Sequence, residues 1–202
     1  MSKSKDKGTK TERALANALK QLGWPEADRK VLEGRFDKGD ITNTPGLCFE
    51  AKDAVVWDGP EWMRETETER VNAGADYGIL VIKAPGVGYQ NAHKWCTVMA
   101  GDAARRVHLL SPERLTAQSL GDGTALHLPA LWEVEVPAMG FLGAWTRLVA
   151  EEKRHPGEVV SLWLPKRMSK VEKIPGYYNL MRLDARCRVL AAAGYGTHES
   201  MG

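Results

Sequence analysis

Two carboxylates and a lysine stand in the sequence at a spacing that suits phosphodiester chemistry. Nine residues separate Asp40 from Glu50, and Lys52 follows Glu50 by two positions. Carboxylates on adjacent strands can converge on one hard cation, and magnesium selects oxygen ligands. A lysine on the same strand face can orient a water molecule or stabilise negative charge in the transition state. The pattern therefore predicts metal-assisted hydrolysis.

An ordinary strand with a solvated charged face would carry the same Glu-x-Lys triplet. Two features favour a functional site. The period of two along residues 47–52 places apolar side chains on one face and groups Glu50 with Lys52 on the other. The aspartate also lies upstream across a predicted turn at residues 43–46.

The elements that must position these side chains indicate an α/β layered core. Apolar residues at helical spacing predict a helix over 11–22, and Thr9 with Glu12 has the form of a capping box. Further elements are expected in this order: a strand over 47–52, a helix over 61–73, a buried strand over 77–82 and a strand over 95–99.

The second half of the chain gives weaker patterns. Residues 102–120 are expected to be helical in part, and Ser111-Pro112 is expected to interrupt this helix or to start a second one. A strand over 131–136, a helix over 141–152, a strand over 159–164 and a helix over 179–193 are expected after it. The glycine-rich turn at residues 121–123 suggests a boundary within 101–130.

Composition excludes several classes of protein. The 202 residues include 28 Lys plus Arg and 26 Asp plus Glu, a net charge of +2 that argues against a polybasic tail. Three widely spaced cysteines exclude a disulfide scaffold and a zinc knuckle. No stretch approaches the ~18 apolar residues of a membrane span, and no signal peptide is visible. We therefore expect a soluble cytoplasmic protein.

Other catalytic motifs find no support. The five histidines lack zinc-site spacing, and Pro85-Gly86-Val87-Gly88 lacks the Gly-Lys-Ser/Thr ending of a phosphate loop. No nucleotide cofactor is expected.

A basic segment in the second half predicts DNA contacts. Residues 165–188 hold seven basic residues against two acidic ones, with Tyr177 and Tyr178 among them. A solvated basic face is the equal alternative. The candidate contacts are Lys166, Arg167, Lys170, Arg182 and Arg186, the last two spaced as one turn of a helix. The residues Trp132, Trp145 and Trp163 are expected in the core.

Residues 7–13 (Lys-Gly-Thr-Lys-Thr-Glu-Arg), Asp40 and Glu50-Ala51-Lys52 resemble the PD-(D/E)xK nuclease superfamily. Within it, the pattern is similar to the archaeal-type Holliday junction resolvases and their phage relatives. The resemblance implies that Glu12, Asp40 and Glu50 surround a divalent metal and that Lys52 completes the site. It also implies a DNA contact at Arg29.

The resemblance covers residues 5–100 and departs from the family at two places. Glycine precedes Asp40 where the family has proline, and Glu65, Glu67 and Glu69 occur where many relatives place a glutamine. Taken alone, Glu12 would be an exposed helix residue or the capping partner of Thr9. We accordingly expect a nuclease core over 1–100 and, over 101–202, an extension of unknown role that supplies DNA contacts or packing.

The resemblance implies a restriction-endonuclease-like α/β core, a mixed central sheet flanked by helices, followed by a C-terminal α/β extension. It implies a magnesium-dependent endodeoxyribonuclease, with manganese able to substitute. The enzyme would act on branched recombination intermediates as a homodimer. Its location would be the cytoplasm, and the cytoplasm of the host if the chain is phage-encoded. Two alternatives stay open: a repair or restriction endonuclease of the same superfamily, and a catalytically silent DNA-binding protein.

Overall fold

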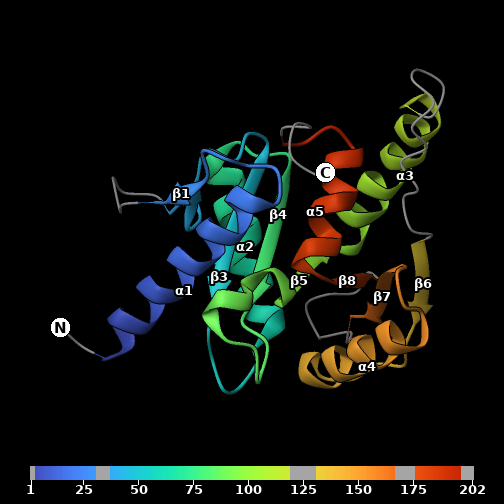
Figure 1. The fold of residues 1–202 in the computed structure, drawn as a ribbon. Coiled ribbons are helices and arrows are strands. Elements are labelled where there is room, and N and C mark those ends of the chain that lie inside the picture. The colour runs from blue at the N-terminus through green and yellow to red at the C-terminus, as the bar shows by residue number, and fades with distance from the viewer. Residues whose placement is uncertain (1–2, 31–36, 119–130, 167–175, 197–202) are drawn as a thin grey trace.

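The chain folds around a mixed six-stranded sheet with helices on both faces, in a computed structural model that describes residues 3–30, 37–118, 131–166 and 176–196 (Figure 1). The strand order is β3-β4-β5-β8-β7-β6. The strands are β3 (Leu47–Lys52), β4 (Tyr77–Ile82), β5 (Cys96–Ala100), β6 (Leu131–Glu135), β7 (Val159–Pro165) and β8 (Tyr177–Arg182). The pairs β3–β4 and β6–β7 are parallel and the others antiparallel. A separate antiparallel pair joins β1 (Asp28–Arg29) to β2 (Ile41–Thr42).

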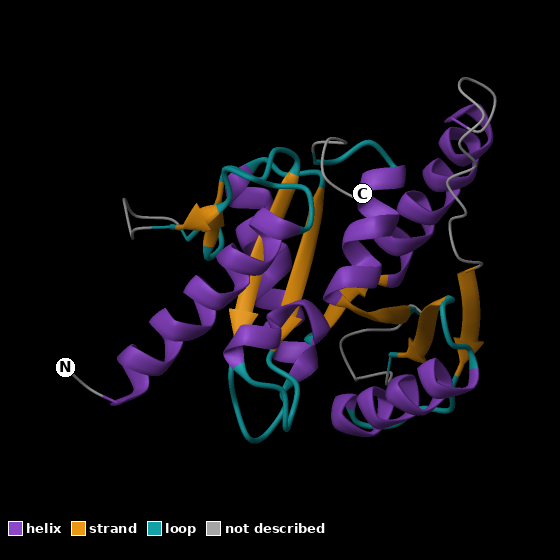
Figure 2. Ribbon diagram, in the orientation of Figure 1, coloured by secondary structure: helices purple, strands orange, loops and turns teal. Residues whose placement is uncertain are grey.

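Two layers of helices cover the sheet (Figure 2). One face carries α1 (Lys3–Gln21), α3 (Gly101–Gln118) and α5 (Leu183–Ala192), and the other carries α2 (Gly59–Ala73) and α4 (Phe141–Arg154). A short 3-10 helix, η1 (Tyr89–Lys94), links β4 to β5 and packs beside α1. Trp24 contacts Phe49 on the first face, and Phe141 contacts Tyr178 on the second.

The expected strands and helices of the first half are confirmed, with local chemistry that explains their ends. β4 is buried at every position, as its continuous apolar run indicates. The side chain of Asp58 caps α2, Pro60 lies in its first turn, and Gly74 ends it with φ +64°.

Two predictions about helix boundaries were wrong. α1 begins at Lys3, so Thr9 and Glu12 lie inside the helix and form no capping box. α3 continues through Ser111-Pro112 to Gln118. Its first half is fixed by wholly buried side chains, Ala104 and Val107, and such packing overrides a local preference for a break.

The expected helix over 179–193 was also wrong in its first part. Residues up to Arg182 form β8, and α5 begins only at Leu183. β8 pairs with β5 on one side and β7 on the other, so distant strands satisfy its backbone groups. Through β8 the sheet runs from the first half of the chain into the second, and one buried core spans both.

The expected strands over 131–136 and 159–164 and the expected helix over 141–152 are confirmed as β6, β7 and α4. The proposed boundary turn at residues 121–123 lies outside the described residues. No helix in the described ranges is long and apolar enough to span a membrane.

Candidate functional site

The polar face of β3 turns its charged side chains toward α2. Lys52 Nζ lies 2.7 Å from Glu50 Oε1 and 2.8 Å from Glu65 Oε2 on that helix. Glu50 is buried, whereas Glu65 is partly exposed. β3 therefore places Glu50 and Lys52 side by side, as the spacing of two predicts.

A tight backbone approach holds Asp40 against the same strand. The Asp40 N–H donates to the Phe49 carbonyl at 2.8 Å, and Asp40 Oδ2 accepts from the Ala51 N–H at 2.8 Å. Gly39, with φ +85°, makes this approach possible: a Cβ there would lie 2.9 Å from the Phe49 carbonyl oxygen and 2.8 Å from Cys48 Sγ. Glycine before Asp40 is thus a geometric requirement of this turn.

The pKa values of Asp40 and Glu50 are both raised, because the two carboxyls are buried close to other carboxylates. Burial, with the nearby charge of Glu50, raises the pKa of Asp40 to about 8, although the Ala51 N–H opposes the shift. Burial and the charge of Glu69 raise the pKa of Glu50 to about 7, against the opposing effect of Lys52. A cation bound between Asp40 and Glu50 would reverse both shifts.

Glu69 is also a member of this cluster, although the resemblance placed it only among three glutamates at a position where many relatives have a glutamine. It lies on α2 with 7% of its surface exposed, within hydrogen-bonding reach of Glu50, and its Oε2 has no hydrogen-bond partner among the described residues. Burial raises its pKa. The sequence contains a signal for Glu69: positions 63, 66 and 69 follow one another at intervals of three and so lie on one face of α2. Met63 and Thr66 on that face are buried.

The predicted catalytic Glu12 approaches the cluster from α1. Its charge contributes to the raised pKa of Asp40. Its carboxylate, however, forms an ion pair with Arg29 Nε on β1. The structure thus brings Glu12, Asp40, Glu50 and Lys52 to one edge of the sheet, and assigns Arg29 a partner within the protein.

The donor set fits magnesium through two carboxylates. The structure does not arrange Glu12, Asp40 and Glu50 as the expected three-carboxylate site, because within the described ranges no group of three or more His, Cys, Asp or Glu side chains could hold a metal ion. Magnesium usually keeps several waters and binds one or two protein carboxylates together with substrate phosphate. Asp40 and Glu50 are within hydrogen-bonding reach of each other and supply that minimum.

The predicted DNA contact at Arg186 was wrong. This residue lies in the first turns of α5 and is wholly buried. Its guanidinium donates to Asn179 Oδ1 at 2.7 Å, to the Asn179 carbonyl at 3.1 Å and to Thr97 Oγ1 at 3.3 Å. Burial lowers its pKa to about 9. Arg186 therefore joins α5 to the sheet and presents nothing to a DNA backbone.

Of the other predicted contacts of the second half, Arg182 and Lys166 are described, and both have neighbours within the protein. Arg182 ends β8, so it is not one helical turn from Arg186, and its guanidinium lies 2.6 Å from Asp184 and 3.7 Å from Glu152. Lys166 Nζ lies 5.0 Å from the centre of the Tyr178 ring. Arg167 and Lys170 fall outside the described residues.

The expectation for the three tryptophans was right for two of them. Trp145 and Trp163 are buried. Trp132 is 45% exposed and stacks on His155 with ring centres 4.0 Å apart, so its assignment to the core was wrong.

Comparison of the chain with family models, with curated proteins and with solved structures finds no match in any of the three. The site is therefore interpreted from its own geometry.

Proposed function

We propose that the chain is a magnesium-dependent endodeoxyribonuclease with a restriction-endonuclease-like core. One observation carries the proposal: a backbone hydrogen bond from Ala51 holds Asp40 beside Glu50, while Lys52 lies 2.7 Å from Glu50. An acidic pair with raised pKa values next to a lysine suits the hydrolysis of a phosphate diester.

Each residue has a role in the proposed reaction. Asp40 and Glu50 hold the metal, which supplies a lowered pKa for a bound water and positive charge beside the phosphate. Lys52 orients the attacking water or stabilises the charge that develops on the phosphate oxygens. Glu12 adds negative charge near Asp40 while Arg29 fixes its orientation.

The preferred substrate in this proposal is a branched DNA intermediate, which a homodimer would cut on two symmetric strands. This part rests on the sequence resemblance to junction resolvases. The two alternatives, a repair or restriction endonuclease and a silent DNA-binding protein, are outcomes of the same experiment.

The test is cleavage of a four-way junction and of a linear duplex with magnesium, with the protein mass measured by light scattering. We expect the junction to be cut in preference, and the mass to be that of a dimer. Preference for the linear duplex would assign the chain to the repair or restriction branch. Binding without any cleavage would favour the silent protein.

Two variants test the site itself. We expect Asp40→Asn and Lys52→Ala each to reduce the cleavage rate at least ~10³-fold, because each removes a group that acts in the transition state. Asp102→Asn and Lys153→Ala, at exposed positions on α3 and α4, are the matched controls and should cut normally. Undiminished cleavage by Asp40→Asn and Lys52→Ala would overturn the assignment.

A further inference from the structure

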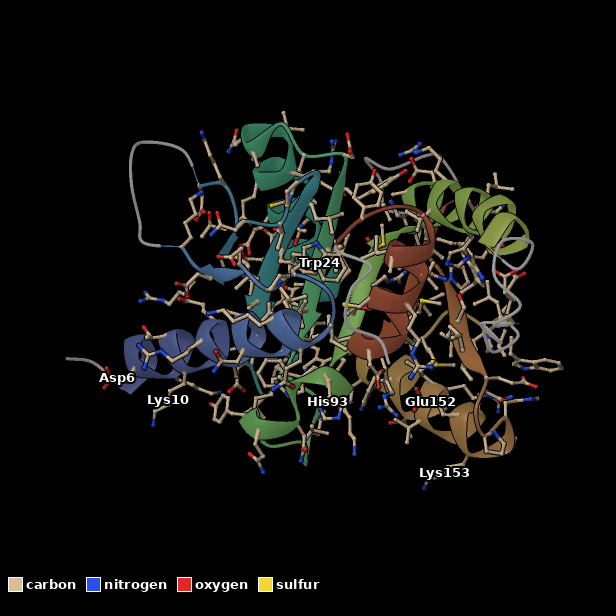
Figure 3. All side chains as sticks on the ribbon, turned by 45° about the horizontal axis from the view of Figure 1, so that its top comes forward. Asp6, Lys10, Trp24, His93, Glu152 and Lys153 are labelled. Carbon is tan, nitrogen blue, oxygen red and sulfur yellow. The ribbon has the colours of Figure 1, made fainter. Side chains whose placement is uncertain are left out.

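A groove of about 560 Å³ lies between α1 and η1. The helix wall carries Lys10, Arg13 and Asn17, and the opposite wall carries Tyr89, Gln90 and His93. Figure 3 shows η1 alongside α1, with Lys10 and His93 labelled on the two elements. Lys10 and Arg13 belong to the residue 7–13 motif, but neither was given a role there, and neither lies in the carboxylate site.

The charge of the groove has one sign. Its lining includes a lysine, an arginine and a histidine, and no aspartate or glutamate. The ion pairs recorded for α1 use Lys7, which contacts Asp53, and Glu12, which contacts Arg29. Within the described part of the chain, Lys10 and Arg13 have no carboxylate within ion-pair distance, and both are exposed. Two exposed cations next to each other suit an anionic ligand.

The remaining polar groups of the groove are hydrogen-bond donors of the kind that contact phosphate. Asn17, Gln21 and Gln90 supply side-chain amides. Lysine, arginine, asparagine, glutamine and tyrosine are among the side chains that contact the sugar–phosphate backbone of DNA. A phosphodiester chain would therefore satisfy both the charge and the donors.

The groove is tied to the strand of the catalytic candidates. Tyr89 donates its hydroxyl hydrogen to Asp53 Oδ2 at 2.9 Å, and Asp53 directly follows Lys52. Lys7 Nζ, on α1, lies 3.0 Å from Asp53 Oδ1. The two walls of the groove are thus joined through the residue at the end of β3, and their separation is fixed.

The groove and the carboxylate site flank the same helix on different sides. At 100° per residue, Glu12 is rotated by about 160° from Lys10 and by about 100° from Arg13. An α-helix with side chains is about 10–12 Å across, which matches the ~12 Å width of a B-DNA major groove. One DNA molecule could therefore reach both sides of α1.

We propose that the groove between α1 and η1 binds the phosphate backbone of DNA, as a contact separate from the cleavage site. This inference rests on the proposed nuclease function for its ligand, but not on catalysis. It adds a backbone contact in the first half of the chain to those predicted over 166–186, of which Arg186 is buried.

The test measures binding of a fluorescent four-way junction by anisotropy over a series of salt concentrations, in EDTA so that no cleavage occurs. The double variant Lys10→Ala/Arg13→Ala should bind about 10-fold more weakly at low salt. Its slope of log affinity against log salt should be smaller by about 1.8, because each phosphate contact contributes ~0.9. The control Lys20→Ala/Lys153→Ala removes the same charge from exposed positions outside the groove and should change neither quantity by a comparable amount.

The outcomes separate this inference from the proposed function. Equal affinity and slope for the two double variants would overturn the groove, whatever the wild type cuts. A selective loss in Lys10→Ala/Arg13→Ala would support the groove even if the wild type never cleaves DNA. Absence of DNA binding by the wild type would overturn both. Circular dichroism melting of each variant verifies that it is folded.

Discussion

Two buried polar clusters, one at the edge strand β3 and one at the central strands β5 and β8, differ in how their charges are compensated. At β3, Asp40, Glu50 and Glu69 gather with Lys52 as their near cation, and the pKa values of all three carboxyls are raised. On the neighbouring strands β5 and β8, the single charge of Arg186 is surrounded by neutral acceptors.

The difference shows which cluster is structural. The Arg186 guanidinium donates from Nε and Nη2 to oxygens of β5 and β8, although its Nη1 has no hydrogen-bond partner among the described residues. The carboxylate cluster leaves Glu69 Oε2 without a partner among the described residues, and carries more negative charge than one lysine balances. An excess of buried like charge is costly unless a ligand or protons compensate it. The carboxylate cluster is therefore suited to binding a cation, and the Arg186 cluster to holding α5 against the sheet.

The largest expected effect on stability concerns Arg186, at the centre of the structural cluster. Arg186→Ala should lower the free energy of unfolding by about 3 kcal/mol, because it leaves a cavity and removes the donors that satisfy Asn179. Urea denaturation measures the loss. Arg188→Ala, an exposed position on the same helix, is the control and should cost less than about 0.5 kcal/mol. Equal losses would mean that Arg186 is not a structural centre.

The next effect tests the carboxylate cluster through pH. Because the folded-state pKa values of Asp40 and Glu50 are raised to about 8 and about 7, the folded state holds protons that the unfolded chain has released. In EDTA, stability should therefore be greatest in acid, and Asp40 alone should lower it by roughly 2–3 kcal/mol between about pH 5 and pH 7, at about 1.4 kcal/mol per proton and pH unit, with Glu50 lowering it further.

Denaturation at the two pH values, with and without magnesium, measures this. Magnesium should stabilise the protein more at the higher pH, where the carboxylates lose their protons. Asp40→Asn should flatten the pH dependence, whereas Asp102→Asn should leave it intact. Two results would contradict the assigned burial and repulsion: stability that rises over this pH range in EDTA, or a pH dependence that is the same in Asp40→Asn and the wild type.

The smallest effect concerns Glu69. Glu69→Gln removes one source of the raised pKa of Glu50, so the pH at which cleavage reaches half its maximum should move down by about one unit or less. Glu61→Gln, on the exposed side of the same helix, provides the comparison. A profile unchanged from the wild type would indicate that Glu69 does not influence the site.

Local patterns predicted more of the first half than of the second. Strand β3 follows from alternation within six residues, and helix α2 follows from its proline and its terminal glycine. Strand β8 could not be found this way, because its pairing with β5 and β7 depends on residues about 80 positions before it and about 15 before it. The same error placed Arg182 and Arg186 on one helix face.

The sequence by itself determined that Glu50 and Lys52 share a strand face and that an aspartate precedes them across a turn, since these relations depend on a period of two and on turn residues. Tertiary structure alone decided which charges are buried together. It placed Glu69 beside Glu50, enclosed Arg186 between α5 and the sheet, and set Lys10 and Arg13 along a groove. The physical reason is that burial and pairing arise from contacts between segments far apart in the chain, which no local spacing encodes.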